Sequence, residues 1–381
     1  MATASAQAPA TFEAAASLLS QATAQRRSVR IVGAGTKLDW GHPVQTDIEL
    51  RTGGLGRIVE HNAGDLTARL EAGVELEQAQ RTFAVAGQML ALDPPLSGAA
   101  TIGGVVATGD CGPLRHRYGA PRDLVVGVTV ALADGTIAQA GGRVIKNVAG
   151  YDLAKLFSGA FGTLGLILAV NVRLHPRHEA SVTAIGSCGD PELLAAASRA
   201  LAAAPLEFEA LDVAWRDGAG SLLARCAGPQ SAGRAGRAAA MMRDVGLTEV
   251  DLAEPDEALW ERQRSGQRSA AGALVRVAAL PSALAAVIRA ASGCEGALVG
   301  RAALGHSFVE VEPEAVSQLR ALLPAGAVAT LLDAPVALRA AVDAWGSPAD
   351  RHDAAIELMR RVKARFDPTG TCNPGLFAGG I

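Results

Sequence analysis

The sequence has 381 residues, a length that exceeds one hydrophobic core and predicts two domains. Apolar residues make up 49% of the chain but aromatic residues only 4%, so alanine, valine and leucine must supply most of the packing. The 35 basic and 38 acidic side chains are interspersed and give a net charge of -3, which argues against a nucleic-acid partner.

The five cysteines are far apart and form no CxxC pair, which argues against a zinc ribbon or an iron–sulfur cluster in this chain. The first 25 residues contain neither a basic residue nor a sustained apolar block, so we expect no signal peptide and a cytoplasmic location. The longest apolar run, 164–170, is far below the roughly 20 residues that span a bilayer. We therefore expect at most a peripheral association with the membrane.

Short strands and single helices alternate in the first half of the chain, which predicts an α+β unit. Helical spacing predicts helices over 11–24 and 74–85. The loop at 93–117 is rich in proline and glycine but holds a short apolar segment, so its length indicates function rather than disorder. A turn-rich stretch follows at 142–152. Strands are predicted at 29–32, 48–51, 57–60, 66–71, 124–132, 136–140 and 164–174, with a hairpin turn at Asp134-Gly135.

The second half of the chain differs in composition from the first. Alanine- and arginine-rich segments that predict helices alternate with predicted strands, and no glycine-dense loop occurs. A hairpin at Asp217-Gly218 and a strand-to-helix junction at Leu280–Ser282 indicate another α+β unit. A helix is predicted over 353–366, followed by a run of turns at 367–375.

The turn Gly33–Lys37 follows a buried strand, but it is not a dinucleotide-binding fingerprint. Leu38 stands where the third glycine would be, and the following Trp40–Pro43 breaks any helix. Glycines let consecutive backbone N–H groups face an anion, and Lys37 adds a positive charge suited to a pyrophosphate. A structural β-turn is the alternative.

Two further loops suit a flat, anionic cofactor. The paired glycines of Thr101–Gly104 would let the main chain lie against a ring system, although a helix start with tight packing is the favoured explanation when this motif is taken by itself. Lys146–Asp152 combines a cation, an amide and a phenol around a turn, and a cation stabilises the negative charge of a reduced flavin. Solvated turn residues are the alternative here.

Taken in order, these segments resemble the FAD domain of the vanillyl-alcohol-oxidase or p-cresol-methylhydroxylase (PCMH) superfamily. Within it they are most similar to the FAD-binding subunits of glycolate oxidases. The resemblance covers the first half and the C-terminal tail. The segments are GAGTK (Gly33–Lys37), TIGG (Thr101–Gly104), RYG-x-x-RD (Arg117–Asp123), KNVAGYDLAKL (Lys146–Leu156), FGTLGLI (Phe161–Ile167) and FDPTGTCNPG (Phe366–Gly375).

The resemblance implies an α+β fold with a two-subdomain PCMH-type FAD-binding domain at 11–179 and a smaller α+β cap domain at 180–345. The segment 346–381 would return to pack on the FAD domain. Noncovalent FAD is expected, because Thr36 and Lys37 offer neither the histidine nor the cysteine of covalent relatives. The expected cofactor contacts are Gly33, Ala34, Gly35, Thr36, Lys37, Pro94, Thr101, Ile102, Gly103, Gly104, Gly109, Gly112, Tyr118, Asp123, Lys146, Tyr151, Gly162, Thr163, Gly165, Ile167 and Asn373.

The resemblance also implies oxidation of glycolate or another 2-hydroxy acid, with electrons passed through the flavin to a partner. The cap holds only His306 and, at its edge, His178, so we expect no metal site. A hetero-oligomer with a second flavoprotein subunit and an iron–sulfur subunit would fit. The alternatives are a stand-alone alcohol oxidoreductase that holds substrate through residues such as Arg276, or a non-catalytic electron-transfer subunit. The sequence identifies no catalytic base.

Overall fold

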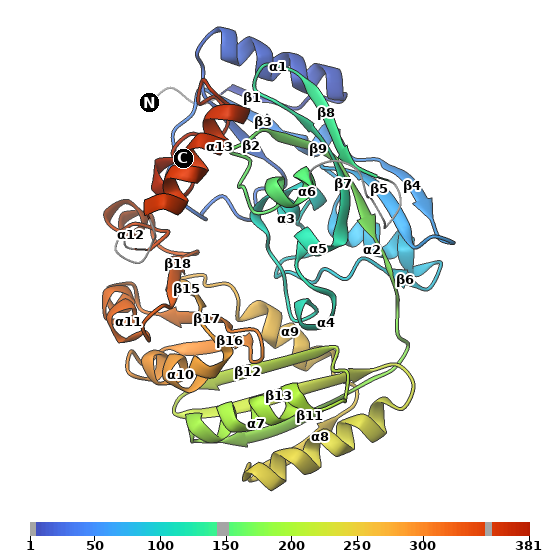
Figure 1. The fold of residues 1–381 in the computed structure, drawn as a ribbon, viewed down its shortest axis with the longest axis vertical. Helices are drawn as coiled ribbons and strands as arrows, with labels where there is room; N and C mark the ends of the chain where they lie inside the picture. The colour runs from blue at the N-terminus through green and yellow to red at the C-terminus, as the bar shows by residue number, and fades with distance from the viewer. Residues whose placement is uncertain (1–4, 143–151, 347–352) are drawn as a thin grey trace. The chain divides into compact units, whose positions relative to one another are not determined.

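The computed structural model describes residues 5–142, 152–346 and 353–381, and the chain divides into two compact units (Figure 1). Unit 1 comprises the chain up to Cys111, Gly119–Arg177 and the C-terminal segment from Arg351. Unit 2 comprises Gly112–Tyr118 and His178–Asp350. The predicted sites Lys146 and Tyr151, and most of the turn-rich stretch 142–152, lie outside the described residues.

A small parallel sheet opens unit 1, with the strand order β1 (Ser5–Gln7), β3 (Ile48–Arg51) and β2 (Val29–Val32). Helix α1 (Phe12–Ala24) begins where the side chain of Thr11 accepts a hydrogen bond from the Ala14 amide. The predicted strands at 29–32 and 48–51 are confirmed, and the predicted helix over 11–24 differs from α1 by one residue.

An antiparallel sheet forms the rest of the unit 1 framework, with the order β4-β5-β9-β7-β8. Leu19 of α1, Leu50 of β3 and Leu166 of β9 share one buried core, so the helix and both sheets pack together. The predicted hairpin at Asp134-Gly135 is confirmed, because it joins β7 to β8. The strands are β4 (Ile58–Asn62), β5 (Thr67–Glu71), β9 (Leu166–Arg173), β7 (Val125–Ala131) and β8 (Ile137–Gly141).

The loop predicted at 93–117 is wrong in part, because it contains helix α3 (Ile102–Thr108) and the start of α4 (Arg115–Tyr118). The Thr101 side chain caps α3 at its start, and Gly109 ends it with a left-handed backbone at φ 67°. A helix therefore starts at Thr101–Gly104, which is one of the two explanations that the sequence offered for this segment. The remaining elements of unit 1 include α2 (Leu76–Ala84), β6 (Gln88–Met89), β10 (His175–Pro176), α5 (Pro121–Leu124), α6 (Leu153–Phe157) and α13 (Asp353–Phe366).

Unit 2 is built on an antiparallel sheet with the order β14-β11-β13-β12-β16-β17-β15-β18. Helices lie on both of its faces. Met242 of α8 (Ser231–Val245) lies against Gly186, whereas Trp260 of α9 (Glu257–Ser265) packs on Leu223, and the pleat directs Gly186 and Leu223 to opposite faces. The strands are β11 (Ser181–Cys188), β12 (Ala210–Arg216), β13 (Ala219–Ala227), β14 (Glu249–Ala253), β15 (Ala273–Ala278), β16 (Ala297–Arg301), β17 (His306–Val311) and β18 (Val328–Leu331).

The predicted hairpin at Asp217-Gly218 joins β12 to β13, and the predicted helix over 353–366 is α13. The junction at Leu280–Ser282 leads through a short 3₁₀ turn into α10 (Leu284–Ser292), as expected. Helix α10 packs against α7 (Pro191–Ala203), which in turn contacts α8, so these three helices form one layer of unit 2. The other helices of unit 2 include α11 (Val316–Leu322) and α12 (Val336–Ala341).

Candidate functional site

A cleft in unit 1 lies between the turn after β2, the start of α3 and the loop before β9. About 810 Å³ of space free of protein atoms, open solvent included, belongs to it. The predicted residues that line it are Gly33, Ala34, Gly35, Thr36, Lys37, Thr101, Gly103, Gly104, Gly162, Gly165, Ile167 and Asn373. Four segments far apart in the sequence thus meet at one cleft.

Glycine allows the first two of these segments to approach one another. A Cβ at Gly33 would lie 2.2 Å from Oγ1 of Thr101, and a Cβ at Gly103 would lie 2.6 Å from Cβ of Ala72. Neither contact is sterically possible, so both positions require glycine if the turn and α3 are to keep their places. At Gly104 a Cβ would meet only Oγ1 of Thr101, at 3.1 Å, so its other side opens to the cleft.

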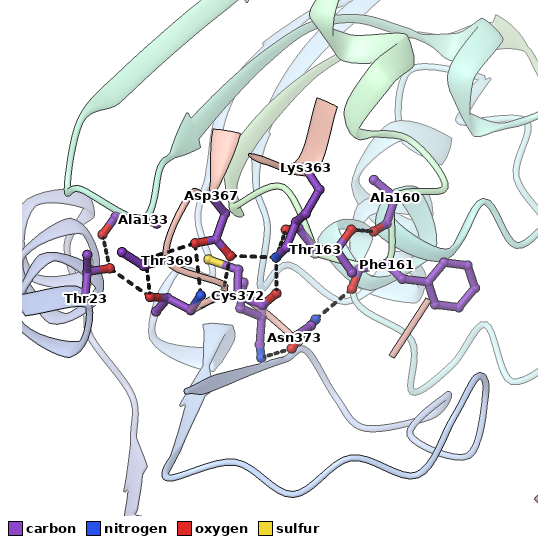
Figure 2. Close-up of polar contacts among 12 residues, drawn as sticks. Thr23, Ala133, Ala160, Phe161, Thr163, Lys363, Asp367, Thr369, Cys372 and Asn373 are labelled. Carbon is purple, nitrogen blue, oxygen red and sulfur yellow. Dashed lines mark hydrogen bonds and ion pairs between the residues drawn. The ribbon is translucent and has the colours of Figure 1, made fainter. Parts of the chain in front are cut away.

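The C-terminal tail fixes the third segment, the loop before β9 (Figure 2). Nδ2 of Asn373 donates to the carbonyl of Phe161 at 2.7 Å, and its Oδ1 accepts from the amide of Ile31 at 2.8 Å. Asn373 itself has a left-handed backbone with φ 43°, which asparagine tolerates better than most residues. One side chain therefore joins β2 to the loop at the edge of the cleft.

A buried lysine supports this arrangement from α13. Nζ of Lys363 donates to the carbonyls of Thr163 at 2.6 Å and Cys372 at 2.9 Å, and it pairs with Asp367 at 2.6 Å (Figure 2). Asp367 in turn accepts from the amides of Thr371 and Cys372. Burial, reinforced by the Asp367 charge, raises the pKa of the Cys372 thiol to about 12, so this thiol stays protonated at neutral pH.

The sequence predicts that Lys37 adds a positive charge suited to a pyrophosphate. In the structure this charge also has a carboxylate partner. Its Nζ lies 3.1 Å from Oδ2 of Asp110, and the two side chains are 5% and 3% exposed. Trp40 lies beneath it, with the ring centre 5.9 Å from Nζ. The positive charge at the cleft is therefore balanced by a carboxylate.

The other predicted residues of the described ranges do not line the cleft. Ile102 and Thr163 are buried in unit 1, Pro94 is buried in its loop, and Gly109 ends α3. Asp123 caps α5 by accepting from the Ala120 amide at 2.9 Å.

Gly112 and Tyr118 fall in unit 2. The hydroxyl of Tyr118 donates to Glu209 at 3.2 Å, and burial together with that carboxylate raises the pKa of the phenol. The nearby His116 has a lowered pKa, because burial and Arg117 disfavour its charged form.

Sequence reasoning missed several residues of the cleft, and all of them except Arg30 are uncharged and none is a glycine. They flank the predicted motifs or come from strand ends that only the fold brings close. They are Arg30, Ile31, Val32, Leu38, Trp40, Thr52, Ala72, Ala107, Thr108, Phe161, Leu166 and Leu376.

Two segments of the chain match families of FAD-dependent proteins. Residues 4–141 match the FAD binding domain family, and residues 348–376 match the C-terminal domain of FAD linked oxidases. Residues 4–141 are thus similar to FAD-binding domains. The two matches indicate FAD as the cofactor, and the second one covers the tail that Asn373 anchors beside the cleft.

Relatives of this chain include two subunits of glycolate oxidases. Subunit GlcE of Escherichia coli (strain K12) is 36% identical over 169 residues, which are 43% of this chain and 47% of that protein. Subunit GlcD of Bacillus subtilis (strain 168) is 36% identical over 152 residues, which are 40% of this chain and 32% of that protein. The chain thus matches less than half of the length of each.

Among solved structures, alkyldihydroxyacetonephosphate synthase has the same fold, with a TM-score of 0.70. The likeness covers 97% of this chain and 76% of that chain at 13% sequence identity, so it shows the fold alone.

The residues of the FAD-binding domain fit the cofactor. Oγ1 of Thr52 is buried at the cleft and has no hydrogen-bond partner within the described part of the chain. A buried hydroxyl of this kind is costly unless a ligand pairs with it. The glycine edges leave backbone close to the space, as a flat ring system requires. In the described ranges, no group of three or more His, Cys, Asp and Glu residues could hold a metal ion, and no helix is long and apolar enough to cross a membrane.

Proposed function

We propose that this protein binds one FAD noncovalently in the unit 1 cleft and uses it to oxidise a 2-hydroxy acid such as glycolate. The observation that carries the proposal is the glycine-edged cleft with the unpaired Thr52 hydroxyl, in a chain whose segments match FAD-binding families. The similarity to two glycolate oxidase subunits supports the choice of substrate class. Noncovalent binding fits the cleft, whose lining residues in the described structure include neither histidine nor cysteine.

Backbone amides and two side chains of this chain would each bind a different part of FAD. Backbone amides of Gly33, Ala34 and Gly35 would bind the pyrophosphate, since the turn presents main chain rather than side chains to the cleft. Lys37 would add a positive charge whose position Asp110 fixes. The hydroxyl of Thr52 would donate to a cofactor oxygen or accept from a ring N–H. FAD, when bound, supplies a two-electron acceptor for the carbon that bears the hydroxyl group.

Electrons would leave this chain for a partner protein rather than for a nicotinamide. The matched relatives are named as glycolate oxidase subunits, which supports a multi-subunit complex. A second flavoprotein subunit and an iron–sulfur subunit are the partners that we propose for it. Residues 33–37 lack the nicotinamide fingerprint, as the missing third glycine indicates.

The experiment is anaerobic mixing of the purified full chain with glycolate, lactate and a sugar alcohol, followed by visible absorbance. A flavin band must be present in the protein or appear after FAD is added, and its absence would sink the proposal. Bleaching by a 2-hydroxy acid supports it. Bleaching by the sugar alcohol alone favours the stand-alone alcohol oxidoreductase. If no substrate bleaches the flavin until partner subunits are added, an electron-transfer role is favoured instead.

A further inference from the structure

Lys363 of α13 lies outside the lining of the cleft, but it holds two segments that belong to that lining. Its ammonium group has three donor hydrogens and three acceptors, which are the carbonyls of Thr163 and Cys372 and the carboxylate of Asp367 (Figure 2). The side chain is buried, so water does not compete for these hydrogen bonds. Lys363 therefore joins the loop before β9 to the C-terminal tail.

The loop 161–165 needs such support, because its backbone is one that a free chain seldom adopts. Phe161 has φ 54°, in the left-handed region that disfavours residues with a side chain. Gly162 and Gly165 also have positive φ, at 68° and 146°, and both line the cleft. A left-handed residue other than glycine persists only where its surroundings hold it. The shape of this wall of the cleft thus depends on contacts from outside the loop.

The C-terminal tail supplies contacts of this kind and also reaches a second wall of the cleft. A Cβ at Gly162 would lie 2.7 Å from Nδ2 of Asn373, so the loop and the tail touch closely. The tail also pairs with β2, because the amide of Val29 donates to the carbonyl of Thr371 at 2.8 Å and the amide of Asn373 donates to the carbonyl of Val29 at 2.9 Å. Strand β2 leads directly into the turn Gly33–Lys37. The tail therefore fixes the turn and the loop together.

We propose that Lys363 is a positioning residue for FAD, and that residues 367–376 form a clasp whose closure sets how tightly the cleft holds the cofactor. Lys363 acts through the carbonyls of Thr163 and Cys372, which keep the loop in the conformation that lines the cleft. Because such coupling is reciprocal, bound FAD should in turn keep the clasp closed. The inference rests on the proposed binding of FAD in this cleft.

The test is titration of the flavin-free full chain with FAD, followed by the change in flavin fluorescence. Lys363→Met keeps most of the length of the side chain but removes all three hydrogen bonds. We expect its Kd for FAD to rise about tenfold or more, the effect of one lost charge-assisted hydrogen bond on a wall of the site. The flavin that still binds should have an altered visible circular dichroism spectrum, because the loop against it has moved.

Arg268→Met separates this role from a merely structural one. Arg268 also pairs with a buried carboxylate at 2.6 Å, that of Asp333, but in unit 2. Its loss should lower the free energy of unfolding and leave the Kd for FAD unchanged, since the molecules that remain folded keep their cleft. Arg360→Met is a second control on α13, because Nη2 of Arg360 donates to the carbonyl of Gly379, beyond the clasp. A Kd in Lys363→Met equal to those of the wild type and both controls would overturn the proposal.

If Lys363→Met does not fold, hydrogen exchange in the wild-type chain decides. The amides of Cys372 and Asn373 donate to Asp367 and Val29, so they exchange only when the clasp opens. Saturating FAD should slow their exchange about tenfold or more, and more than it slows the amide of Leu274 in unit 2. The same change at all three amides, or none, overturns the proposal.

The two proposals fail separately. FAD that binds with the expected dependence on Lys363 but is never reduced by a 2-hydroxy acid leaves the clasp standing and contradicts the proposed function. FAD that a 2-hydroxy acid reduces, but that Lys363→Met binds as tightly as the wild type does, contradicts the role of Lys363 alone.

Discussion

The ammonium group of Lys37 lies 3.1 Å from the carboxylate of Asp110, and both side chains are almost wholly buried. Lys37 ends the glycine turn after β2, and Asp110 follows Gly109, the residue that ends α3. The ion pair therefore ties two walls of the cleft together. It also means that substitutions at either residue act on the fold as well as on the cofactor.

Replacement of Lys37 by alanine should both destabilise unit 1 and weaken FAD binding. The substitution removes the cation that is paired with the buried Asp110 carboxylate, which costs about 3 to 5 kcal/mol in comparable buried pairs. Urea denaturation measures the first effect and the flavin content of the purified protein measures the second. Asp110→Asn should also destabilise the protein but keep its FAD, because the cation at the cleft remains.

The exposed pair of Lys155 and Asp152 is the control for this prediction. Its Nζ–Oδ2 distance is also 3.1 Å, but the two side chains are 47% and 51% exposed. Lys155→Ala should change the free energy of unfolding by only about 0 to 1 kcal/mol, because water screens the pair. If Lys37→Ala were as mild as Lys155→Ala, the buried pair would not have the role assigned to it.

Gly104→Val should block FAD while the protein stays folded. The new side chain meets Oγ1 of Thr101 at 3.1 Å and otherwise extends into the cleft, so it occupies cofactor space rather than core space. We expect a thermal unfolding midpoint close to that of the wild-type apoprotein and loss of the visible flavin band, even after FAD is added.

Two glycine variants separate cofactor exclusion from misfolding. Gly103→Ala should destabilise the fold, because its Cβ would lie 2.6 Å from that of Ala72. Gly53→Ala should change nothing, since no atom lies within 4 Å of the added carbon. Normal flavin content in Gly104→Val would contradict the position assigned to FAD.

Local pattern predicted much of the framework. The strand at 29–32 and the helix at 353–366 follow from apolar periodicity, and the hairpin at Asp134-Gly135 follows from turn chemistry. The many prolines and glycines of 93–117 led to the prediction of one long loop. The structure contains α3 there, and the helix-capping residues Thr101 and Gly109 are the sequence signal that marks its two ends.

The cleft was harder to predict, because its geometry depends on contacts between distant segments. Lys363 reaches a carbonyl 200 positions earlier in the chain, and no local pattern marks such a pairing. Adjacent residues of helix α3 also have different surroundings. Gly103 and Gly104 line the cleft, whereas Ile102 is buried in the core. Thr52 carries no motif, and only its burial without a partner distinguishes it.

Asn373→Ala should destabilise unit 1 by about 2 to 4 kcal/mol. The change removes the acceptor of the Ile31 amide and a donor to the Phe161 carbonyl, and the loss of a hydrogen bond by a buried or part-buried group costs about 1 to 3 kcal/mol each, of which relaxation relieves a part. Urea denaturation measures the loss. Asn62→Ala is the control, because Asn62 is exposed and bonds only within its own turn, to Asp65. Similar losses for both variants would contradict the anchoring role of Asn373.

Two groups of unit 2 should give stability opposite dependences on pH. The pKa of His306 is lowered from 6.5 to about 4, chiefly by burial, so the unfolded chain alone takes up a proton as pH falls through that window. Stability from His306 is therefore lost between about pH 6.5 and pH 4. Burial raises the pKa of Asp212 from 3.8 to about 6, so the folded chain alone takes up a proton between those values, and acidification there stabilises it.

Urea denaturation at pH 7 and pH 4.5 tests these signs. His306→Gln removes the group that favours unfolding in acid, so the variant should lose less stability than the wild type on acidification. Asp212→Asn removes the group that opposes acid unfolding and should lose more. An equal acid-induced loss of stability in the wild type and both variants would contradict the pKa directions. It would also contradict their causes, which are the burial of both groups and, for His306, the positive charges near it.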